Sequence, residues 1–273
     1  MKRIAFILSL ITFITSCSPK AQNLNSTKTS EKENAESIRV MAYNVHHCNP
    51  PSKPGLIDID AIAKAIKDQN PDLVALQEID VNTLRSGKFN QAEEIAKKLD
   101  MHFFFAKAID HEGGDYGVAI LSKYPLSDTK INRLPTEEGT KGEPRVLATA
   151  KIKLPNGKVI LFGSTHLDAQ KAPVNRELQI KEVNRIAAEE ELPFIIAGDF
   201  NAQPGSSVIN RLDQHFTRSC QDCDFTIPVI NPNKTIDFIA FAPKSAFSVQ
   251  STQVIPERYA SDHLPVVSVL KLN

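Results

Sequence analysis

The sequence lacks an excess of charge of either sign, because 32 Lys and Arg residues balance 32 Asp and Glu residues. If Lys2 and Arg3 leave with a leader peptide, 30 basic residues face 32 acidic ones, a net charge of −2. Strong non-specific affinity for DNA or RNA normally rests on a basic field. The composition therefore weighs mildly against a nucleic-acid partner, although a local basic groove is still open.

Cysteine is scarce, with four residues in the whole chain. Cys220 and Cys223 form one C-x-x-C, with no second such pair and no paired His nearby, which disfavours a zinc ribbon. The pair does not open a helix after a strand, so redox catalysis is disfavoured too. In an oxidising compartment a local disulfide is one possibility, and two free thiols are the other.

Two catalytic signatures are also missing. The chain has no G-x-S-x-G elbow, which disfavours a covalent serine mechanism, and no H-E-x-x-H zinc pattern. No internal repeat, low-complexity block or second linker divides the chain after its polar N-terminal stretch. These absences leave one large domain whose chemistry has to come from other residues.

The N-terminus, MKRIAFILSLITFITSC, has two basic residues, an apolar core of secretory length and a small-residue exit. This pattern predicts an export signal, and it is too short to span a membrane. Its exit resembles the bacterial lipobox, in which the cysteine, here Cys17, is lipidated and becomes the first mature residue. An ordinary signal peptide with a chance cysteine is the alternative.

Residues 18–37 are almost free of apolar side chains, which predicts a flexible tether. We therefore expect a lipoprotein signal peptide at 1–16, the lipidated Cys17 and tether at 17–37, and a globular domain at 38–273. A lipid followed by a tether predicts a protein that is anchored to a membrane rather than spanning it. We expect a monomeric lipoprotein of the cell envelope, periplasmic or on the outer membrane, and Ser18 is compatible with outer-membrane sorting.

Strands and helices alternate along the domain in a pattern that excludes a purely parallel sheet. Pro155-Asn156-Gly157 lies between two apolar runs and predicts a hairpin. Strands are predicted at 38–43, 72–77, 118–121, 148–154, 158–164, 194–198, 236–241, 247–255 and 264–272, and helices at 58–69, 90–99 and 174–190. Two mixed sheets packed face to face with helices outside, a four-layer α/β sandwich, fit this order.

The string FIIAGDFN at 194–201 places Asp199 and Asn201 after a buried strand. In extended chain, residues two apart point the same way, so both could face one target, although ordinary turn chemistry is the alternative. Five further predicted strands also have polar residues near their ends. These residues lie after the strand in three cases, inside it in one and just before it in one. They are Asn44, His46 and His47; Glu78; His166 and Asp168; Asp237; and Asp262 with His263. This oxygen-rich set suits a hard cation and a phosphate bound to it.

Together these segments resemble the endonuclease/exonuclease/phosphatase superfamily, the deoxyribonuclease I-like group. The resemblance rests on strings that occur in the family's order from about Val40 to Val267. They are MAYNVHH, VALQEID, RSGKFNQ, GGDYGVAILSKYPL, EPRVLATA, STHLD, AGDFNAQP, IDFIAF and SDHLPV. The start, the RSG segment and STHLD look most like the small bacterial metal-dependent hydrolase branch.

The resemblance implies hydrolysis of a phosphoester, with a phosphodiester expected, by in-line attack of water with Mg²⁺ or Mn²⁺. Carried over residue by residue, it implies a metal held by Glu78 with Asn44 and Asp262. Asp199 would activate the water, Asn201 would hold the phosphate, and His263, supported by Asp237, would stabilise the phosphoryl charge. His166 would be a phosphate contact or acid, and its presence argues against the apurinic-endonuclease branch.

Other residues have weaker assignments. Arg145 is either a donor to substrate phosphate or part of a surface salt bridge, and one of His46 and His47 is expected to face the cleft. Arg85 and Tyr116 lie in matching segments without an assigned role. We expect Lys171 and Arg176 to lie on a solvated face of the following helix.

The resemblance leaves the substrate open among a lipid, a sugar phosphate and a nucleic acid. Inositol-polyphosphate 5-phosphatases carry W-x-G-D-x-N-Y-R and P-x-W-C-D-R, whereas this chain reads AGDFNAQP and contains no Trp. Few aromatics and no basic excess weaken the nuclease alternative, and no exposed apolar loop of the sphingomyelinase kind is evident. A noncatalytic binding lipoprotein on the same scaffold is the other alternative.

Overall fold

The computed structural model describes Met1 and residues 37–273. The predicted signal peptide, Cys17 and nearly all of the tether lie outside the described residues, so the structure does not bear on them. Within the described part of the chain, no helix is both long and apolar enough to cross a bilayer.

The first sheet combines the two ends of the domain with its first third. Its strand order is β11-β12-β1-β2-β4-β3, and only the β1–β2 pair is parallel. The strands are β1 (Ser37–Asn44), β2 (Leu73–Val81), β3 (His102–His111), β4 (Gly114–Ser122), β11 (Phe247–Val254) and β12 (Val266–Leu272). Because β12 runs antiparallel to β1, the segment just before β12 lies at the end of the sheet where β1 and β2 finish.

The second sheet has the order β5-β6-β7-β8-β10-β9, and its one parallel pair is β7–β8. Its strands are β5 (Leu126–Arg133), β6 (Val146–Lys153), β7 (Val159–His166), β8 (Phe194–Asp199), β9 (Thr217–Arg218) and β10 (Asp237–Ala242). The predicted hairpin forms as expected between β6 and β7. Strand β10 starts opposite the end of β8, with Asp237 facing Asp199 in the register.

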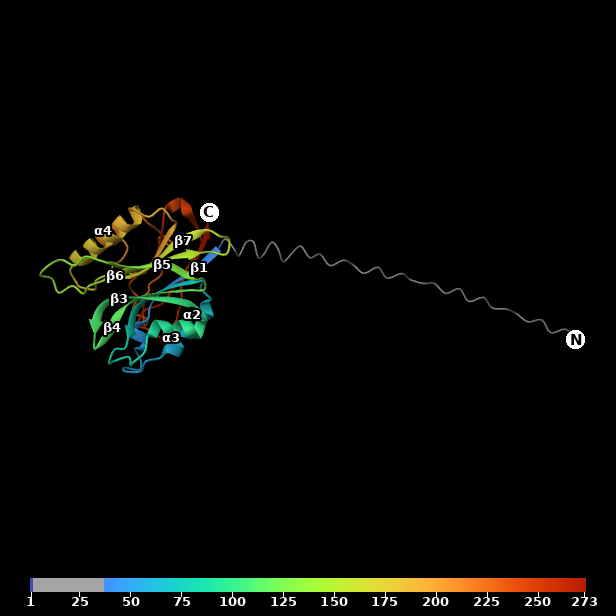
Figure 1. The fold of residues 1–273 in the computed structure, drawn as a ribbon, viewed down its shortest axis with the longest axis horizontal. Coiled ribbons are helices and arrows are strands. Elements are labelled where there is room, and N and C mark those ends of the chain that lie inside the picture. The colour runs from blue at the N-terminus through green and yellow to red at the C-terminus, as the bar shows by residue number, and fades with distance from the viewer. Residues whose placement is uncertain (2–36) are drawn as a thin grey trace.

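The helices cover the outer faces of the sheets, as Figure 1 shows, with α2 (Ile59–Gln69) and α3 (Gln91–Leu99) on one side and α4 (Val174–Ala188) on the other. The short helix α5 (Ser207–Leu212) packs beside α4, and the 3-10 turns η1 (His46–Cys48) and η2 (Lys244–Ala246) complete the described elements. One apolar cluster fills the space between the sheets, and one fills the space under each helical layer. The predicted four-layer architecture of two mixed sheets is confirmed.

The helix starts follow their capping residues. The Asp58 carboxylate accepts from the backbone N–H of Ala61, and the Asn90 amide oxygen accepts from that of Glu93, at 2.9 and 3.3 Å. These bonds satisfy donors that the first helical turn leaves free. The sequence therefore placed the starts of α2 and α3 within one residue.

Several predicted boundaries and elements differ from the structure. Strand β2 does not stop before Glu78 but continues to Val81, with an irregular register between Leu76 and Ile79. Strands β3, β5 and β9 and helix α5 were not predicted. Strand β5 is mostly exposed and polar and so lacks the alternation that marks a half-buried strand, and β9 and α5 are only 2 and 6 residues long.

Gly198 is the close-approach point between the parallel strands β7 and β8. A Cβ atom built on it would lie 2.0 Å from the backbone oxygen of Thr165, whereas one on Gly157, in the hairpin, would meet nothing within 4 Å. The strand that carries Asp199 can therefore lie against β7 only because residue 198 has no side chain.

We expect Gly198→Ala to lower the free energy of unfolding by about 3 kcal/mol or more, because two backbones would have to separate. Gly157→Ala, at φ +85°, is the control, since it has the strain of a left-handed residue without the clash and should cost about 1–2 kcal/mol. Chemical denaturation of both variants measures the difference. Equal losses would contradict the close-packing argument.

Candidate active site

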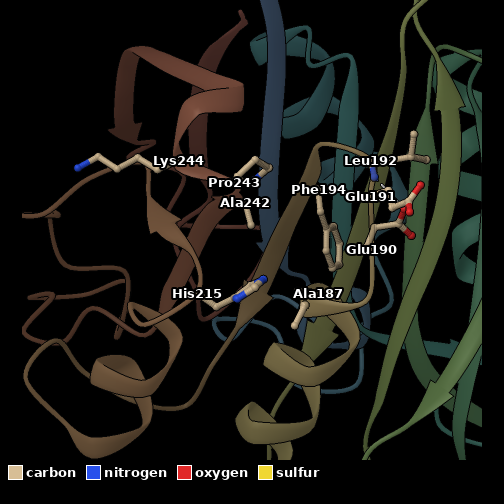
Figure 2. A pocket seen from close by; sticks show the side chains of 10 residues that line it. Ala187, Glu190, Glu191, Leu192, Phe194, His215, Ala242, Pro243 and Lys244 are labelled. Atoms are coloured by element: carbon tan, nitrogen blue, oxygen red, sulfur yellow. Dashed lines mark hydrogen bonds between the residues drawn. The ribbon is translucent and has the colours of Figure 1, made fainter.

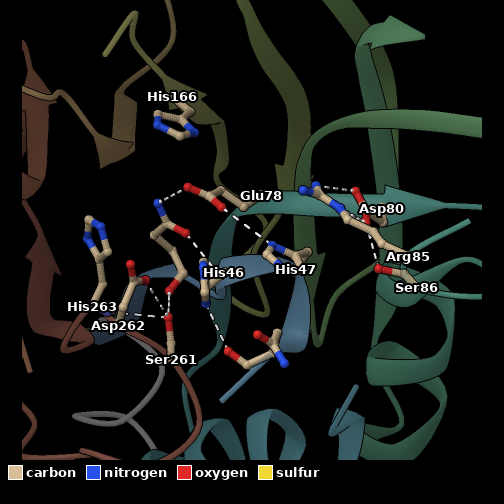
Figure 3. Close-up of polar contacts among 12 residues, drawn as sticks. His46, His47, Glu78, Asp80, Arg85, Ser86, His166, Ser261, Asp262 and His263 are labelled. Carbon is tan, nitrogen blue, oxygen red and sulfur yellow. Dashed lines mark hydrogen bonds and ion pairs between the residues drawn. The ribbon is translucent and has the colours of Figure 1, made fainter. Parts of the chain in front are cut away.

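The predicted site residues meet at one end of the two sheets. Strands β1, β2, β7 and β8 finish there, and β10 and β12 begin there, so segments far apart in sequence deliver side chains to one place. Figure 3 shows the part of this site that comes mainly from the first sheet, with His166 facing it from the second. Loops at strand ends are where a rigid scaffold usually presents chemistry.

Asn44 links the two sheets. Its amide nitrogen donates to Glu78 Oε1 at 3.0 Å and to Asp199 Oδ2 at 3.2 Å, while its amide oxygen accepts from the backbone N–H of His46 at 3.0 Å. Its nitrogen rather than its oxygen therefore faces the carboxylates. A metal-ligand role for Asn44 would require the amide to turn over, and that role is still a prediction.

Glu78 occupies an irregular position in β2. It has a φ of +59° where the register shifts, which turns its side chain out of the regular alternation. Its side chain is 22% exposed, and its Oε2 lies 3.9 Å from His47 Nδ1. Burial alone would raise the pKa of Glu78, but the contacts with His47 and Asn44 hold it well below its usual range.

Asp199 and Asn201 are joined by a tight turn rather than by extended chain. Asn201 has a φ of +48°, and its backbone N–H donates to Asp199 Oδ1 at 2.8 Å. The expectation that both side chains share a direction because of strand periodicity is therefore wrong. Both nevertheless reach His166, whose Nε2 lies 3.0 Å from the Asn201 amide nitrogen and 3.5 Å from Asp199 Oδ2.

His166 is buried at the end of β7 with Arg145 behind it. Arg145 Nη1 lies 3.2 Å from His166 Nδ1, and since a guanidinium can only donate, this ring nitrogen accepts. Burial and the charge of Arg145 lower the pKa of His166 well below its usual range. The imidazole is therefore neutral. Its Nε2 lies beside the Asn201 amide nitrogen, which also donates to the backbone oxygen of Leu167 at 3.0 Å, and beside Asp199.

His263 and Asp237 form a buried pair. The distance from His263 Nδ1 to Asp237 Oδ2 is 2.9 Å, and His263 Nε2 lies 3.8 Å from Asp199 Oδ2. Burial opposes the charge on this ring, but the carboxylate of Asp237 outweighs it and raises the pKa of His263 to about 10. Burial, followed by the charge of Asp237, raises the pKa of Asp199 to about 7.

Asp262 and Tyr116 lie at the margin of this group. Asp262 is half-buried and Ser261 Oγ donates to its Oδ1 at 3.5 Å, while the same hydroxyl lies 2.7 Å from the backbone oxygen of Asn44. Tyr116 is buried, and burial and the charge of Glu78 raise its pKa. Arg145 also contacts Glu143 at 3.0 Å and is buried, so a surface salt bridge does not describe it.

Arg85 supports the site from a distance. Its guanidinium donates twice to the buried carboxylate of Asp80, at 2.7 and 2.9 Å, and lies over the ring of Tyr116. Ser86 and Thr83 donate to the same carboxylate. We infer that this network holds the loop after β2. Of the two adjacent histidines, His47 faces Glu78, whereas His46 contacts the backbone oxygen of Asn49.

Two side chains do not lie where the sequence placed them. Arg176 is not on a solvated face but is buried, and its Nη1 donates to the backbone oxygens of Asp168 and Gln170. Asp168 accepts the backbone N–H groups of Glu143 and Gln170, so it orders loops instead of facing the carboxylates. Hydrophobic spacing could not reveal either contact, because both partners are backbone atoms of loops.

A separate cavity of about 290 Å³ lies at the other end of β8, where Phe194 starts the strand (Figure 2). His215, Glu190 and Lys244 line it, and none of the predicted site residues does. Cys220 and Cys223 form a disulfide in the loop before β10, which resolves the two possibilities left by the sequence. Cys48 is buried and free.

The donor set fits a hard divalent cation. Asp199, Asp237 and His263 offer ligand atoms within 4.8 Å of one another, the one such group of His, Cys, Asp or Glu side chains found among the described residues. Glu78 adds a third carboxylate across the Asn44 bridge. Burial, followed by the negative charge of Asp237, raises the pKa of Asp199, and a cation would offset that charge.

The comparison with protein families shows which family the chain belongs to. The profile of the Endonuclease/Exonuclease/phosphatase family matches residues 41–263, so the chain belongs to this family. Members of the family are hydrolases that act on phosphoesters and generally depend on a divalent metal. The predicted family and fold are confirmed, whereas the small bacterial branch and the lipoprotein assignment are not tested by these matches.

Individual relatives differ in what their names describe. The inositol phosphosphingolipids phospholipase C of Schizosaccharomyces pombe is 23% identical over 192 residues, covering 63% of this chain but 43% of that protein. A crystal structure from Beutenbergia cavernae, described as an endonuclease/exonuclease/phosphatase, has a TM-score of 0.71 at 25% identity and covers 87% of this chain and 72% of that one.

A second similar structure is the mannosyl-6-phosphatase of Bacteroides thetaiotaomicron, with a TM-score of 0.68 at 19% identity over 85% of this chain and 99% of that one. This similarity shows the fold alone. The chain spans less than half the length of the phospholipase C. None of these names therefore fixes a substrate for this chain.

We expect Asp237→Asn to lower the pKa of His263 from about 10 toward or below 6.5, because burial then outweighs the remaining charges. NMR titration of the imidazole in metal-free protein measures this, with Asp222→Asn at an exposed position as the control. Because the pKa of His263 is raised in the folded state, the protonated ring stabilises the fold fully below about pH 6.5, and this stabilisation is lost as the pH rises toward 10. The stability of Asp237→Asn should not fall between pH 6.5 and 10 in this way. A His263 ring that still titrates near 10 in the variant would contradict the role of Asp237.

Proposed function

We propose that this protein is a Mg²⁺- or Mn²⁺-dependent phosphoesterase that hydrolyses a phosphodiester by in-line attack of water. The observation that carries the proposal is the meeting of Asn44, Glu78, His166, Asp199 and His263 at one end of two sheets, within hydrogen-bond or ion-pair range of one another. The bound cation would polarise a phosphoryl oxygen and offset the charge that develops on it. Glu78 and Asp262, with Asn44 if its amide turns over, are the residues that would hold it.

The neutral and charged imidazoles have different roles. His166, held by Arg145, presents its Nε2 beside the Asn201 amide. A proton on this nitrogen would donate to a phosphoryl oxygen that Asn201 places next to it. His263, kept protonated by Asp237, supplies positive charge next to the same oxygens. Arg145 acts on the substrate through His166 in this arrangement.

Asp199 is the group that would take the proton from water. Its carboxylate is buried between His166 and His263, and a base whose pKa lies near 7 matches proton transfer at neutral pH. Asn44 and the backbone N–H of Asn201 fix both of its oxygens. The carboxylate is thereby preorganised and need not reorient during the reaction.

We further propose that the enzyme acts outside the cytoplasm, anchored through a lipid on Cys17. The signal-like N-terminus and the polar residues 18–36 support this, and the Cys220–Cys223 disulfide is compatible with an oxidising compartment. A nuclease on the same site is the alternative activity, and a noncatalytic binding lipoprotein is the alternative class. We expect a monomer, because one chain supplies every residue of the site.

Loss of a site residue should abolish the activity. We expect Glu78→Gln and His263→Ala to lower kcat/KM for bis(p-nitrophenyl) phosphate with Mg²⁺ or Mn²⁺ by about 10²- to 10⁴-fold. Glu190→Gln and His215→Ala, in the remote cavity, are matched controls that should stay within about twofold. No hydrolysis of phosphomonoesters, phosphodiesters, lipids or DNA by the wild type with any divalent metal would contradict the enzyme assignment.

Cys17→Ser should release the protein from the membrane. Removal of the only thiol that can carry the lipid leaves the tether without an anchor, since membrane binding here rests on acyl chains. Fractionation of cells and metabolic labelling with a tagged fatty acid measure the change, and Cys48→Ser serves as the control. Wild-type protein that is unlabelled and found in the soluble fraction would overturn the anchoring proposal without affecting the proposed reaction.

A further inference from the structure

A basic cavity adjoins the catalytic carboxylates. It has a volume of about 590 Å³, compared with about 290 Å³ for the cavity at the other end of β8. Asn201 and Ile236 belong to its wall, and they are immediate neighbours of the catalytic segment: Asn201 contacts His166, and Ile236 precedes Asp237. A substrate whose phosphate lies at Asn201 would therefore extend its remaining part into this cavity.

The charge of the cavity is opposite to that of the site beside it. Lys171, Arg176 and Lys234 line it, and no Asp or Glu does. Lys171 and Lys234 are exposed, and within residues 37–273 no ion pair involves either ammonium group. Two carboxylates on the neighbouring segments are engaged elsewhere: Asp168 accepts two backbone N–H groups, and Glu177 accepts from the hydroxyl of Ser207 at 2.5 Å.

The two walls that carry the lysines are fixed by the fold. The backbone of Lys234 forms a bridge with Ile227, with N–H to oxygen distances of 3.0 and 3.1 Å, in the segment between the Cys220–Cys223 disulfide and β10. On the other wall, Arg176 donates to the backbone oxygen of Gln170, the residue before Lys171. The backbone that carries each lysine is therefore held by hydrogen bonds, while the two ammonium groups form no ion pair within residues 37–273.

The volume and charge select a class of ligand. A cavity of this size accommodates a small molecule rather than a duplex. Unpaired cations facing one concavity favour an anion, and a second phosphate group offers the most acceptor oxygens and charge. A neutral sugar or diacylglycerol leaving group would leave both ammonium groups without partners.

Building on the proposed phosphoesterase activity, we propose that the substrate is a small organic phosphoester that carries a second phosphate group. The scissile phosphate lies at Asn201 and His166, and Lys171 and Lys234 bind the second phosphate in the adjoining cavity. Gln203, which lines the same cavity, is placed to contact the organic part between the two phosphates. Lys171 and Lys234 are therefore specificity-determining residues that do not touch the reacting bond.

The test compares fructose 1,6-bisphosphate with fructose 6-phosphate, which differ by one phosphate. Their dissociation constants are measured by calorimetry on the Mg²⁺-loaded protein, and their inhibition constants against hydrolysis of bis(p-nitrophenyl) phosphate. We expect the wild type to bind the bisphosphate at least about tenfold more tightly, and the difference to shrink at high salt. In Lys171→Ala/Lys234→Ala the preference should fall below about threefold, with hydrolysis of the chromogenic diester unchanged within about twofold.

The control variant removes the same charge elsewhere. Lys67→Ala/Lys97→Ala alters two exposed lysines on α2 and α3, on the far side of the first sheet, and should keep the wild-type preference. A bisphosphate preference that persists in the cavity variant, or that falls equally in the control, would overturn the proposal. Tighter, Lys171- and Lys234-dependent binding of a short oligothymidylate would overturn it too, because the second phosphate would then belong to a nucleic acid.

The two readouts separate this proposal from the one it rests on. If the wild type hydrolyses no phosphoester but still binds the bisphosphate through Lys171 and Lys234, the reaction is wrong and the anion site is right. If it hydrolyses the chromogenic diester and shows no bisphosphate preference, the reaction is right and the anion site is wrong.

Discussion

The site depends on two carboxylates that the fold forces to lie opposite each other. Asp199 ends β8 and Asp237 begins the antiparallel β10, and the register pairs them directly. Like charges in this position destabilise a sheet, and both side chains are buried. The pKa of Asp199, raised to about 7, is the direct consequence of burial and this pairing. His263, which precedes β12 of the first sheet, partly offsets this negative charge. A side chain from one sheet thus stabilises the carboxylates of the other.

The geometry around this pair depends on left-handed backbone conformations that residues other than glycine seldom adopt. Glu78, Asn201 and His47 have φ values of +59°, +48° and +43°, each at a point where a regular element is interrupted. Such positions cost about 1–3 kcal/mol each and persist only where the surrounding structure determines them. Here the Asn44 bridge, the turn from Asn201 to Asp199 and the Asp80–Arg85 network provide that support. The strain and its compensation concentrate at the end of the sheets where the carboxylates lie.

The sequence predicted the layers and the membership of the site better than its local geometry. Periodicity located β8 and its polar end, because a buried strand followed by Gly198, Asp199 and Asn201 has a clear pattern. It could not show that Asn201 turns back to Asp199, or that Glu78 lies in an irregular strand rather than beyond it, since single left-handed residues leave no hydrophobic pattern. Arg176 was misplaced for a related reason: its partners are loop carbonyls, whose positions only the assembled fold defines.

The distribution of charge in the fold resolves an apparent conflict between composition and chemistry. A chain with no net charge does not attract polyanions electrostatically over long distances. Glu78, Asp199 and Asp237 nevertheless lie together at the ends of buried strands, where a cation can neutralise them, while Lys171 and Lys234 line the adjoining cavity. Screening limits exposed ammonium groups to contacts within about 8–10 Å, so they can act only on a ligand already held in the cavity. Recognition at this site is therefore local, and the same argument that disfavours a long nucleic-acid track favours a compact substrate with more than one anionic group.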